Sequence, residues 1–316
     1  MSICKISYDD FLLSLKQELE LYLGEDFVVE QKRVIKNNGV VLDGMLIRSF
    51  EEPVIPSIYV NQYYDQFTAG RSLGTIVEEI ISIYQESREE AAELGNHFSY
   101  EFSEVKYRIT YRLIHYEKNR ELLEDVPHLR FLDLAITFHC LVRNDEDGIG
   151  AIRITKEHIK HWGIPLSELW SLAMENTKRL FPPVLRPMEE VVFDLMSQNN
   201  HVTEEEIQDF ANQNRQCGMY VLTNSKGING AAAMLYPDIL QSFEKKIDSE
   251  FYILPSSIHE VILVPCQYGI NNEKERKREK LLQMVTEINE TQVATEEVLS
   301  NNVYDNVQII QAIRDL

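Results

Sequence analysis

Residues 218–265 constrain the fold more than any other part of this chain, because strand, turn and helix signals follow one another closely there. Apolar runs of strand length at residues 219–222 and 231–236 flank the turn-rich segment 224–230, and this pattern predicts a hairpin. Pro237 then begins a predicted helix. Two more strand-length runs complete the module, at residues 251–254 and 261–264. Strands and a helix within one short stretch indicate an α+β fold.

The first part of the chain has a similar mixture of elements. An apolar stripe at helical spacing predicts an amphipathic helix over residues 8–23. Residues 27–35 and 40–47 are predicted strands around Asn38-Gly39, the preferred chemistry for a tight hairpin turn with positive φ. Gly44 interrupts the second strand and predicts a β-bulge there.

An aromatic-rich run follows, and it has two interpretations. Its rings are those of Tyr59, Tyr63, Tyr64 and Phe67. Such a stripe could stack a ligand, but rings of this kind more often pack in a core or lie half-buried. Core packing is therefore the favoured interpretation.

A loop near residue 100 divides the chain into two modules. Residues 73–84 predict a helix, residues 95–100 read as a loop, and a further helix is predicted to end at His115. We therefore expect an N-terminal α+β module over residues 1–100 and a larger α+β module over residues 101–316. The larger module is predicted to end in helices, over residues 274–288 and 296–313.

Several elements of the larger module have clear local signals. Residues 130–142 are too continuously apolar for a surface strand and predict a central one. Thr155 is a predicted N-cap for a helix over residues 156–162, and Gly163 ends that helix. A second helix is predicted over residues 166–180. The fold class is thus α+β, with two mixed modules that contain antiparallel hairpins and flanking helices.

Charge and composition exclude some functions. The chain has 31 basic and 51 acidic residues and a formal net charge of −20, which repels nucleic acid and anionic lipid. The one dense basic cluster, residues 274–280, is interleaved with acids and is interpreted as a solvated helix start. The N-terminal segment lacks an uninterrupted apolar run, so neither a signal peptide nor a membrane span is expected. The four cysteines lack short spacings, and together these features predict a cytoplasmic protein.

Five segments carry a resemblance to a known family. They are residues 34–44, 133–138, 173–177, 219–224 and 254–261. With these segments the chain resembles an uncharacterised domain family of anaerobic Gram-positive bacteria over nearly its whole length. It is similar, more distantly, to a second bacterial family of unknown function, in which Arg-Asp stands where this chain has His259-Glu260.

The resemblance implies a fold and a location, but no activity. Neither family has an established enzyme activity, so the resemblance favours a cytoplasmic protein with the same order of elements. Members of the first family are often encoded among accessory or mobile-element genes. This context implies an interaction or defence-related role.

Residues 255–260 contain the strongest candidate catalytic groups. Ser257, His259 and Glu260 have the hydroxyl, imidazole and carboxylate that a hydrolase uses as nucleophile, base and orienting group. In an extended segment, however, Ser257 and His259 share a face while Glu260 points to the other. The favoured interpretation is structural, because Ser257 and Glu260 have the spacing of a capping box.

Candidate ligand sites for metals and cofactors are weaker. His158 and His161 are spaced i, i+3 on a predicted helix and could face one metal ion, but a third ligand is missing. His139-Cys140 resembles a thiol–imidazole pair, yet consecutive strand residues project oppositely, so core packing is favoured. The glycines of residues 226–230 suggest an anion-binding nest, for which a hairpin turn is the simpler interpretation. No cofactor is expected.

Two functional hypotheses follow from these observations. The leading one is a non-enzymatic cytoplasmic protein that binds a protein partner and neither nucleic acid nor membrane. The alternative is a hydrolase or transferase that uses Ser257 and His259 with a carboxylate from another segment.

Overall fold

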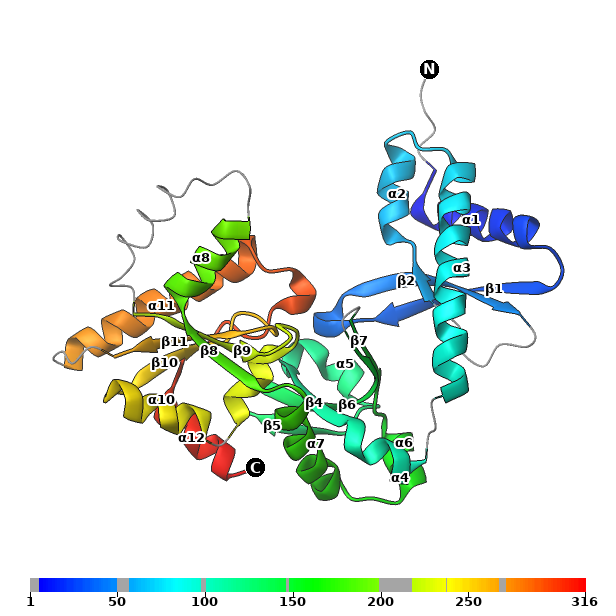
Figure 1. Cartoon of the computed structure of the whole chain (residues 1–316). Coiled ribbons are helices and arrows are strands. Elements are labelled where there is room, and N and C mark those ends of the chain that lie inside the picture. The colour runs from blue at the N-terminus through cyan, green and yellow to red at the C-terminus, as the bar shows by residue number, and fades with distance from the viewer. Residues whose placement is uncertain are drawn as a thin grey trace. The chain divides into compact units, whose positions relative to one another are not determined.

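The computed structural model describes residues 6–49, 57–97, 101–145, 148–198, 218–236, 238–266 and 271–316. The chain forms two compact units, Met1–Tyr100 and Glu101–Leu316. Within the described residues, strands form three sheets, and every pairing between strands is antiparallel. The helices flank these sheets, as Figure 1 shows. The predicted α+β class is confirmed.

The first unit packs three helices against a three-stranded sheet of order β1-β2-β3. Its elements are α1 (Tyr8–Leu23), β1 (Phe27–Ile35), β2 (Val41–Ser49), β3 (Ser57–Tyr59), α2 (Asn61–Thr68) and α3 (Leu73–His97). Apolar side chains from the helices and from β1 and β2 form one core, which includes Phe11, Leu15, Met45, Ile47, Tyr63 and Ile80. The helix predicted over residues 8–23 is confirmed.

The first hairpin forms as its turn chemistry predicts. Asn38 and Gly39 have φ of 59° and 71°, so both residues lie in the left-handed region that a tight turn between twisted strands requires. The bulge predicted at Gly44 is wrong, because the pairing of β1 with β2 is unbroken there. A Cβ at Gly44 would lie 2.3 Å from Ser57 Oγ, so the glycine instead allows β3 to approach.

Three rings of the aromatic run, those of Tyr63, Tyr64 and Phe67, lie in the core of this unit or pack against it. The Tyr63 side chain is fully buried, the Tyr64 ring lies edge-on to Tyr8 at 5.1 Å, and the Phe67 ring lies 5.3 Å from Phe11. These contacts confirm the packing interpretation over a ligand-stacking one.

The second unit contains two sheets. One is built on the central strand β6 (Leu134–Asn144), which pairs with β4 (Ile109–His115) along one edge and with β5 (His128–Phe131) and β7 (Ile149–Arg153) along the other. The other sheet has the order β12-β10-β11-β9-β8. Its strands are β8 (Pro183–Pro187), β9 (Tyr220–Asn224), β10 (Phe251–Leu254), β11 (Val261–Pro265) and β12 (Tyr304–Asp305).

Helices surround both sheets of the second unit (Figure 1). They are α4 (Phe102–Val105), α5 (Arg120–Leu123), α6 (Lys156–Trp162), α7 (Leu166–Leu180), α8 (Met188–Gln198), α10 (Ile239–Ile247), α11 (Asn271–Thr291) and α12 (Asn306–Arg314). The caps predicted at Thr155 and Gly163 are confirmed, with Gly163 at φ 68°. The predicted helix over residues 166–180 has the bounds of α7.

Several local predictions are wrong in this unit. The helix predicted to end at His115 is strand β4, whose alternate residues Ile109, Tyr111 and Leu113 are buried. The central strand predicted at residues 130–142 forms as the buried strand β6, but it begins only at Leu134, because a tight turn at Leu132, where φ is 56°, separates it from β5. The last predicted helix is confined to α12, because β12 occupies part of its expected range.

The hairpin predicted after residue 218 is also wrong in its second half. Strand β9 forms, but the next apolar run is the 3-10 helix η4 (Gly230–Leu235). Strand β9 already has β8 on one edge and β11 on the other, so no edge is left for a returning strand. The apolar run after β9 therefore forms a 3-10 helix instead of a paired strand.

Candidate functional site

The segment with the predicted catalytic groups forms a turn between β10 and β11, which the backbone of residues 297–300 closes. Ser257 pairs with Val298 in an isolated antiparallel bridge. The Ile258 N–H donates to Glu297 O at 2.9 Å, and the Ser300 N–H donates to Pro255 O at 2.9 Å. These bonds place Ser257, His259 and Glu260 in one turn.

The Ser257 hydroxyl serves the backbone of that turn. Its Oγ accepts a hydrogen bond from the His259 N–H at 2.9 Å. No helix begins at this point, so the predicted capping box does not form, and β11 follows directly. Burial raises the pKa of Glu260, and a hydrogen bond from Ser257 to its carboxylate opposes that shift. Within the described residues, no hydrogen bond joins Ser257 Oγ to the His259 ring.

The His259 ring bridges two other segments. Its Nδ1 accepts a hydrogen bond from the Asn229 N–H at 3.3 Å, and its Nε2 lies 3.4 Å from Glu297 Oε1. The backbone oxygen of His259 accepts a hydrogen bond from Thr223 Oγ1 at 2.8 Å. Because Nδ1 is an acceptor, Nε2 carries the proton and faces the carboxylate. The His259 ring therefore connects the turn before η4 to Glu297. Neither of these two contacts is predicted by the sequence.

The histidine pair proposed for a metal lies on α6, where His158 has a structural role. Its Nδ1 accepts a hydrogen bond from the Thr155 N–H at 3.0 Å, and its ring stacks on Trp162 with centroids 5.7 Å apart. Burial lowers the pKa of His158. His161 is exposed. In the described ranges, no group of three His, Cys, Asp or Glu side chains could hold a metal ion.

The thiol and imidazole of Cys140 and His139 are packed in the sheet. Both side chains are buried in β6, and burial raises the pKa of the Cys140 thiol to about 11. The pKa of His139 lies well below its usual value, chiefly because the ring is buried and also because Arg112 and Arg153 are nearby. Core packing, the favoured interpretation of this pair, is therefore confirmed.

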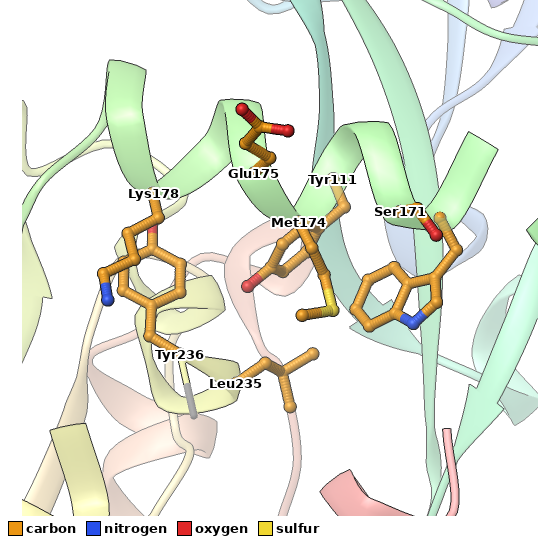
Figure 2. Close-up of a pocket in the computed structure, with 8 residues that line it drawn as sticks. Tyr111, Ser171, Met174, Glu175, Lys178, Leu235 and Tyr236 are labelled. Atoms are coloured by element: carbon orange, nitrogen blue, oxygen red, sulfur yellow. The ribbon is translucent and has the colours of Figure 1, made fainter. Parts of the chain in front are cut away.

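A surface cleft lies between α7 and η4, and sequence reasoning did not find it. Its volume is about 370 Å³. Tyr111, Trp170, Met174, Leu235 and Tyr236 supply its apolar lining, and Ser171, Glu175 and Lys178 supply polar groups. In Figure 2, Met174 and Leu235 point toward each other, while the Glu175 carboxylate points away from Leu235.

The walls of the cleft are held in place by hydrogen bonds and ring contacts. The Tyr111 hydroxyl donates to Ala232 O at 3.0 Å, and the Tyr236 hydroxyl donates to Phe181 O at 2.9 Å. The Tyr111 and Trp170 rings meet edge-on with centroids 5.2 Å apart. The cleft is thus preformed. One sequence signal for it exists, because Trp170, Met174 and Lys178 follow one another at i, i+4 and i+8 on α7.

The polar residues of two segments that carry the family resemblance, residues 173–177 and 219–224, mainly form hydrogen bonds with the backbone. Asn176 Nδ2 donates to Ile109 O at 3.0 Å, and Thr177 Oγ1 accepts from the Tyr111 N–H at 3.0 Å, so α7 holds the edge of β4. Asn224 Nδ2 donates to Ile228 O at 2.9 Å, which closes the turn after β9. These polar side chains therefore stabilise the fold by hydrogen bonds with the backbone.

Comparisons with known proteins give a family but no described relative. A family model without an assigned function matches residues 8–305. No curated protein and no solved structure matches the chain. Among the described helices, none is long and apolar enough to cross a membrane.

Proposed function

The chain belongs to DUF5688, a family of unknown function, and from this premise we propose that the protein is a non-enzymatic interaction protein. It binds a protein partner through the cleft between α7 and η4. The observation that carries this proposal is the cleft itself, a preformed apolar hollow of about 370 Å³ with charged groups at its margin. A hollow of this size and lining has the form of a typical ligand pocket, and the anchor side chains of a protein partner fill pockets of this kind.

The partner supplies an apolar side chain next to a basic one. Large apolar anchors bind best in pockets lined by aromatic and aliphatic groups, as Trp170, Met174 and Leu235 are. Glu175 is exposed and has no ion-pair partner in the described part of the chain, whereas Lys178 is paired with Asp238 at 2.8 Å. A net charge of −20 also attracts a basic partner.

The arrangement of the turn at Ser257 favours this function over catalysis. A general base needs a free ring nitrogen within reach of the nucleophile, but His259 Nδ1 is occupied by the Asn229 N–H. A cytoplasmic location is part of the proposal. It is supported by the free thiols of Cys140 and Cys266.

One observation keeps the hydrolase or transferase as a second candidate. Glu297 lies beside His259 and comes from a different segment, as the orienting carboxylate of a catalytic histidine does. An activity screen with ester, phosphoester and nucleotide substrates separates the candidates. Turnover that is lost in His259→Ala at unchanged stability would establish the second function.

A photo-crosslinking experiment tests the proposed function. The photoreactive residue p-benzoylphenylalanine replaces Ser171, which is exposed and lines the cleft, and irradiation is done in native host cells. Ser167 is the matched control position, because it is also an exposed serine of α7 but does not line the cleft. We expect a discrete adduct from position 171 and none from position 167.

A second substitution makes the experiment specific. Met174→Glu places a charge inside the cleft and is expected to abolish the adduct from position 171. Equal adducts from both positions, or an adduct that persists in Met174→Glu, would contradict the proposal.

A further inference from the structure

Strand β1 lies at the edge of the sheet in the first unit, and within the described residues it pairs only with β2. This pairing runs without a bulge along the whole strand, from Phe27 to Ile35, and the strand contains no proline. Proline and bulges are two common devices that keep other strands away from a long edge. Because β1 has neither, its outer edge has the regular geometry that a further strand needs.

The odd-numbered residues of β1 direct their backbone groups toward this outer edge. The Lys36 N–H donates to Val40 O at 2.7 Å at the end of the hairpin, so the even-numbered residues are those that bond to β2. The Phe27 N–H accordingly donates to Gly24 O, in the turn before β1, at 3.4 Å. The backbone groups in the middle of the outer edge are therefore those of Val29, Gln31 and Arg33.

The side chains of β1 are self-complementary around Gln31. When two copies of β1 pair antiparallel about this residue, positions equally distant from it lie opposite each other. Glu30 of each copy then faces Lys32 of the other. Val28, which is 42% exposed, faces Val34 in the same way. Pairs of opposite charge and apolar pairs at facing positions both stabilise a sheet.

The nearest alternative registers lack this complementarity. Residues with backbone groups at the outer edge can bond only to residues that also face that edge, so the register can shift only to a centre at Glu30 or at Lys32. A pairing centred on Glu30 places two glutamates opposite each other, and one centred on Lys32 places two lysines opposite each other. Like charges at facing positions are destabilising. The order of charges along β1 therefore favours the register centred on Gln31.

We propose that the outer edge of β1 binds β1 of a second copy of this chain, antiparallel and centred on Gln31. The three-stranded sheets of the two copies then form one continuous sheet. The contact is isologous, since the same strand is used on both sides, and it closes after two copies. It is independent of the cleft, because β1 belongs to the first unit and the residues of the cleft belong to the second.

Sedimentation equilibrium of the full chain tests the proposal through the dissociation constant of the dimer. We expect a dimer for the wild type. Glu30→Lys sets a lysine opposite Lys32 at two places in the dimer and should weaken dimerisation by about tenfold or more. The double variant Glu30→Lys/Lys32→Glu exchanges the two charges and should restore the dimer. Glu78→Lys is the matched control, because Glu78 is an exposed glutamate of α3 in the same unit, and it should leave the dissociation constant unchanged.

Two further measurements locate the contact. Hydrogen exchange should be slow at the amides of Val29, Gln31 and Arg33 in the wild type and fast in Glu30→Lys, whose folding is checked by thermal unfolding. Met174→Glu should dimerise normally, so failure of the cleft and failure of this edge can be told apart.

Four results would overturn the proposal. A monomeric wild type would mean that the charges of β1 keep other strands away from its edge. Wild-type dimerisation in Glu30→Lys, or a folded double variant that remains monomeric, would exclude the register centred on Gln31. Loss of the dimer in Met174→Glu would place the contact at the cleft. Protection of the β1 amides that appears only in extract of the host cells would assign the edge to a different protein.

Discussion

The Tyr304 hydroxyl donates a hydrogen bond to the Asp133 carboxylate, which joins positions 171 residues apart. Asp133 also accepts hydrogen bonds from Ser300 Oγ at 2.7 Å and Asn302 Nδ2 at 2.8 Å. Burial, and after it the nearby charge of Asp133, raises the pKa of Tyr304. One carboxylate thus holds the turn between β5 and β6 to the segment that contains β12.

Asp133→Ala should destabilise the protein by about 1 to 3 kcal/mol, because buried Ser300 and Tyr304 lose their acceptor. Urea unfolding measures the change. Asp315→Ala, at an exposed carboxylate bound only by Gln311 among the described residues, is the control and should change stability by less than about 0.5 kcal/mol. Equal effects of the two substitutions would show that the contact with Tyr304 contributes little.

Gly39→Val should lower stability by on the order of 1 to 2 kcal/mol, because Gly39 has φ of 71° and a β-branched residue is strained there. Gly74→Ala is the matched control. Gly74 lies in α3 with open space around its Cα, so alanine should be neutral or slightly stabilising. Thermal unfolding of both variants provides the test, and an unchanged midpoint for Gly39→Val would disprove the strain argument.

The turn at Ser257 should respond as a structural unit. Ser257→Ala and His259→Ala should each lower stability by about 0.5 to 2 kcal/mol, since each removes an acceptor for a backbone N–H. The loss of stability in His259→Ala is larger than the sequence suggests, because the ring accepts a hydrogen bond from Asn229, which lies in another segment. A double-mutant cycle with Glu297→Ala measures the His259 coupling. A coupling energy of zero would mean that the contact between His259 and Glu297 contributes nothing to stability.

Stability should fall as pH decreases from about 6.5 to 5, in part because of His139. The folded protein keeps this ring neutral, since burial holds its pKa well below the usual value of 6.5. The unfolded chain takes up the proton first, so acid favours unfolding by at most about 1.4 kcal/mol per pH unit for this group. His115 and His158, whose pKa values are also lowered by burial, act in the same direction.

Urea unfolding across that pH range isolates the contribution of His139. His139→Gln should flatten the dependence, whereas His161→Gln, at an exposed position, should not. The same slope in wild type and His139→Gln would assign the acid sensitivity to other groups.

Local signals predicted the elements whose ends depend on neighbouring residues. Thr155 and Gly163 cap α6 through contacts within four positions, and Asn38-Gly39 closes its hairpin in the same way. The run after β9 was misassigned because its state depends on β8 and β11, which fill both edges of β9. Such pairing is not visible in a short window of sequence.

The candidate sites show the same limit. Sequence placed Ser257, His259 and Glu260 together, but the partners that define their roles, Asn229 and Glu297, lie in distant segments. The cleft lies between α7 and η4. Met174 and Leu235, which point toward each other across it, are distant in the sequence and are brought together only when the chain folds (Figure 2). A helical stripe alone does not reveal what lies across from it.

The strand order β12-β10-β11-β9-β8 has a consequence for synthesis on the ribosome. Strand β8 begins at Pro183, but β12, which completes its sheet, begins only at Tyr304. The turn at Asp133 also lacks its hydrogen bond from Tyr304 until that residue has been synthesised. The nascent second unit therefore cannot close its sheet until nearly all of its residues have left the exit tunnel. Until then, the outer edge of β10 remains open to other strands, so chaperones that shield unpaired edges should matter during translation.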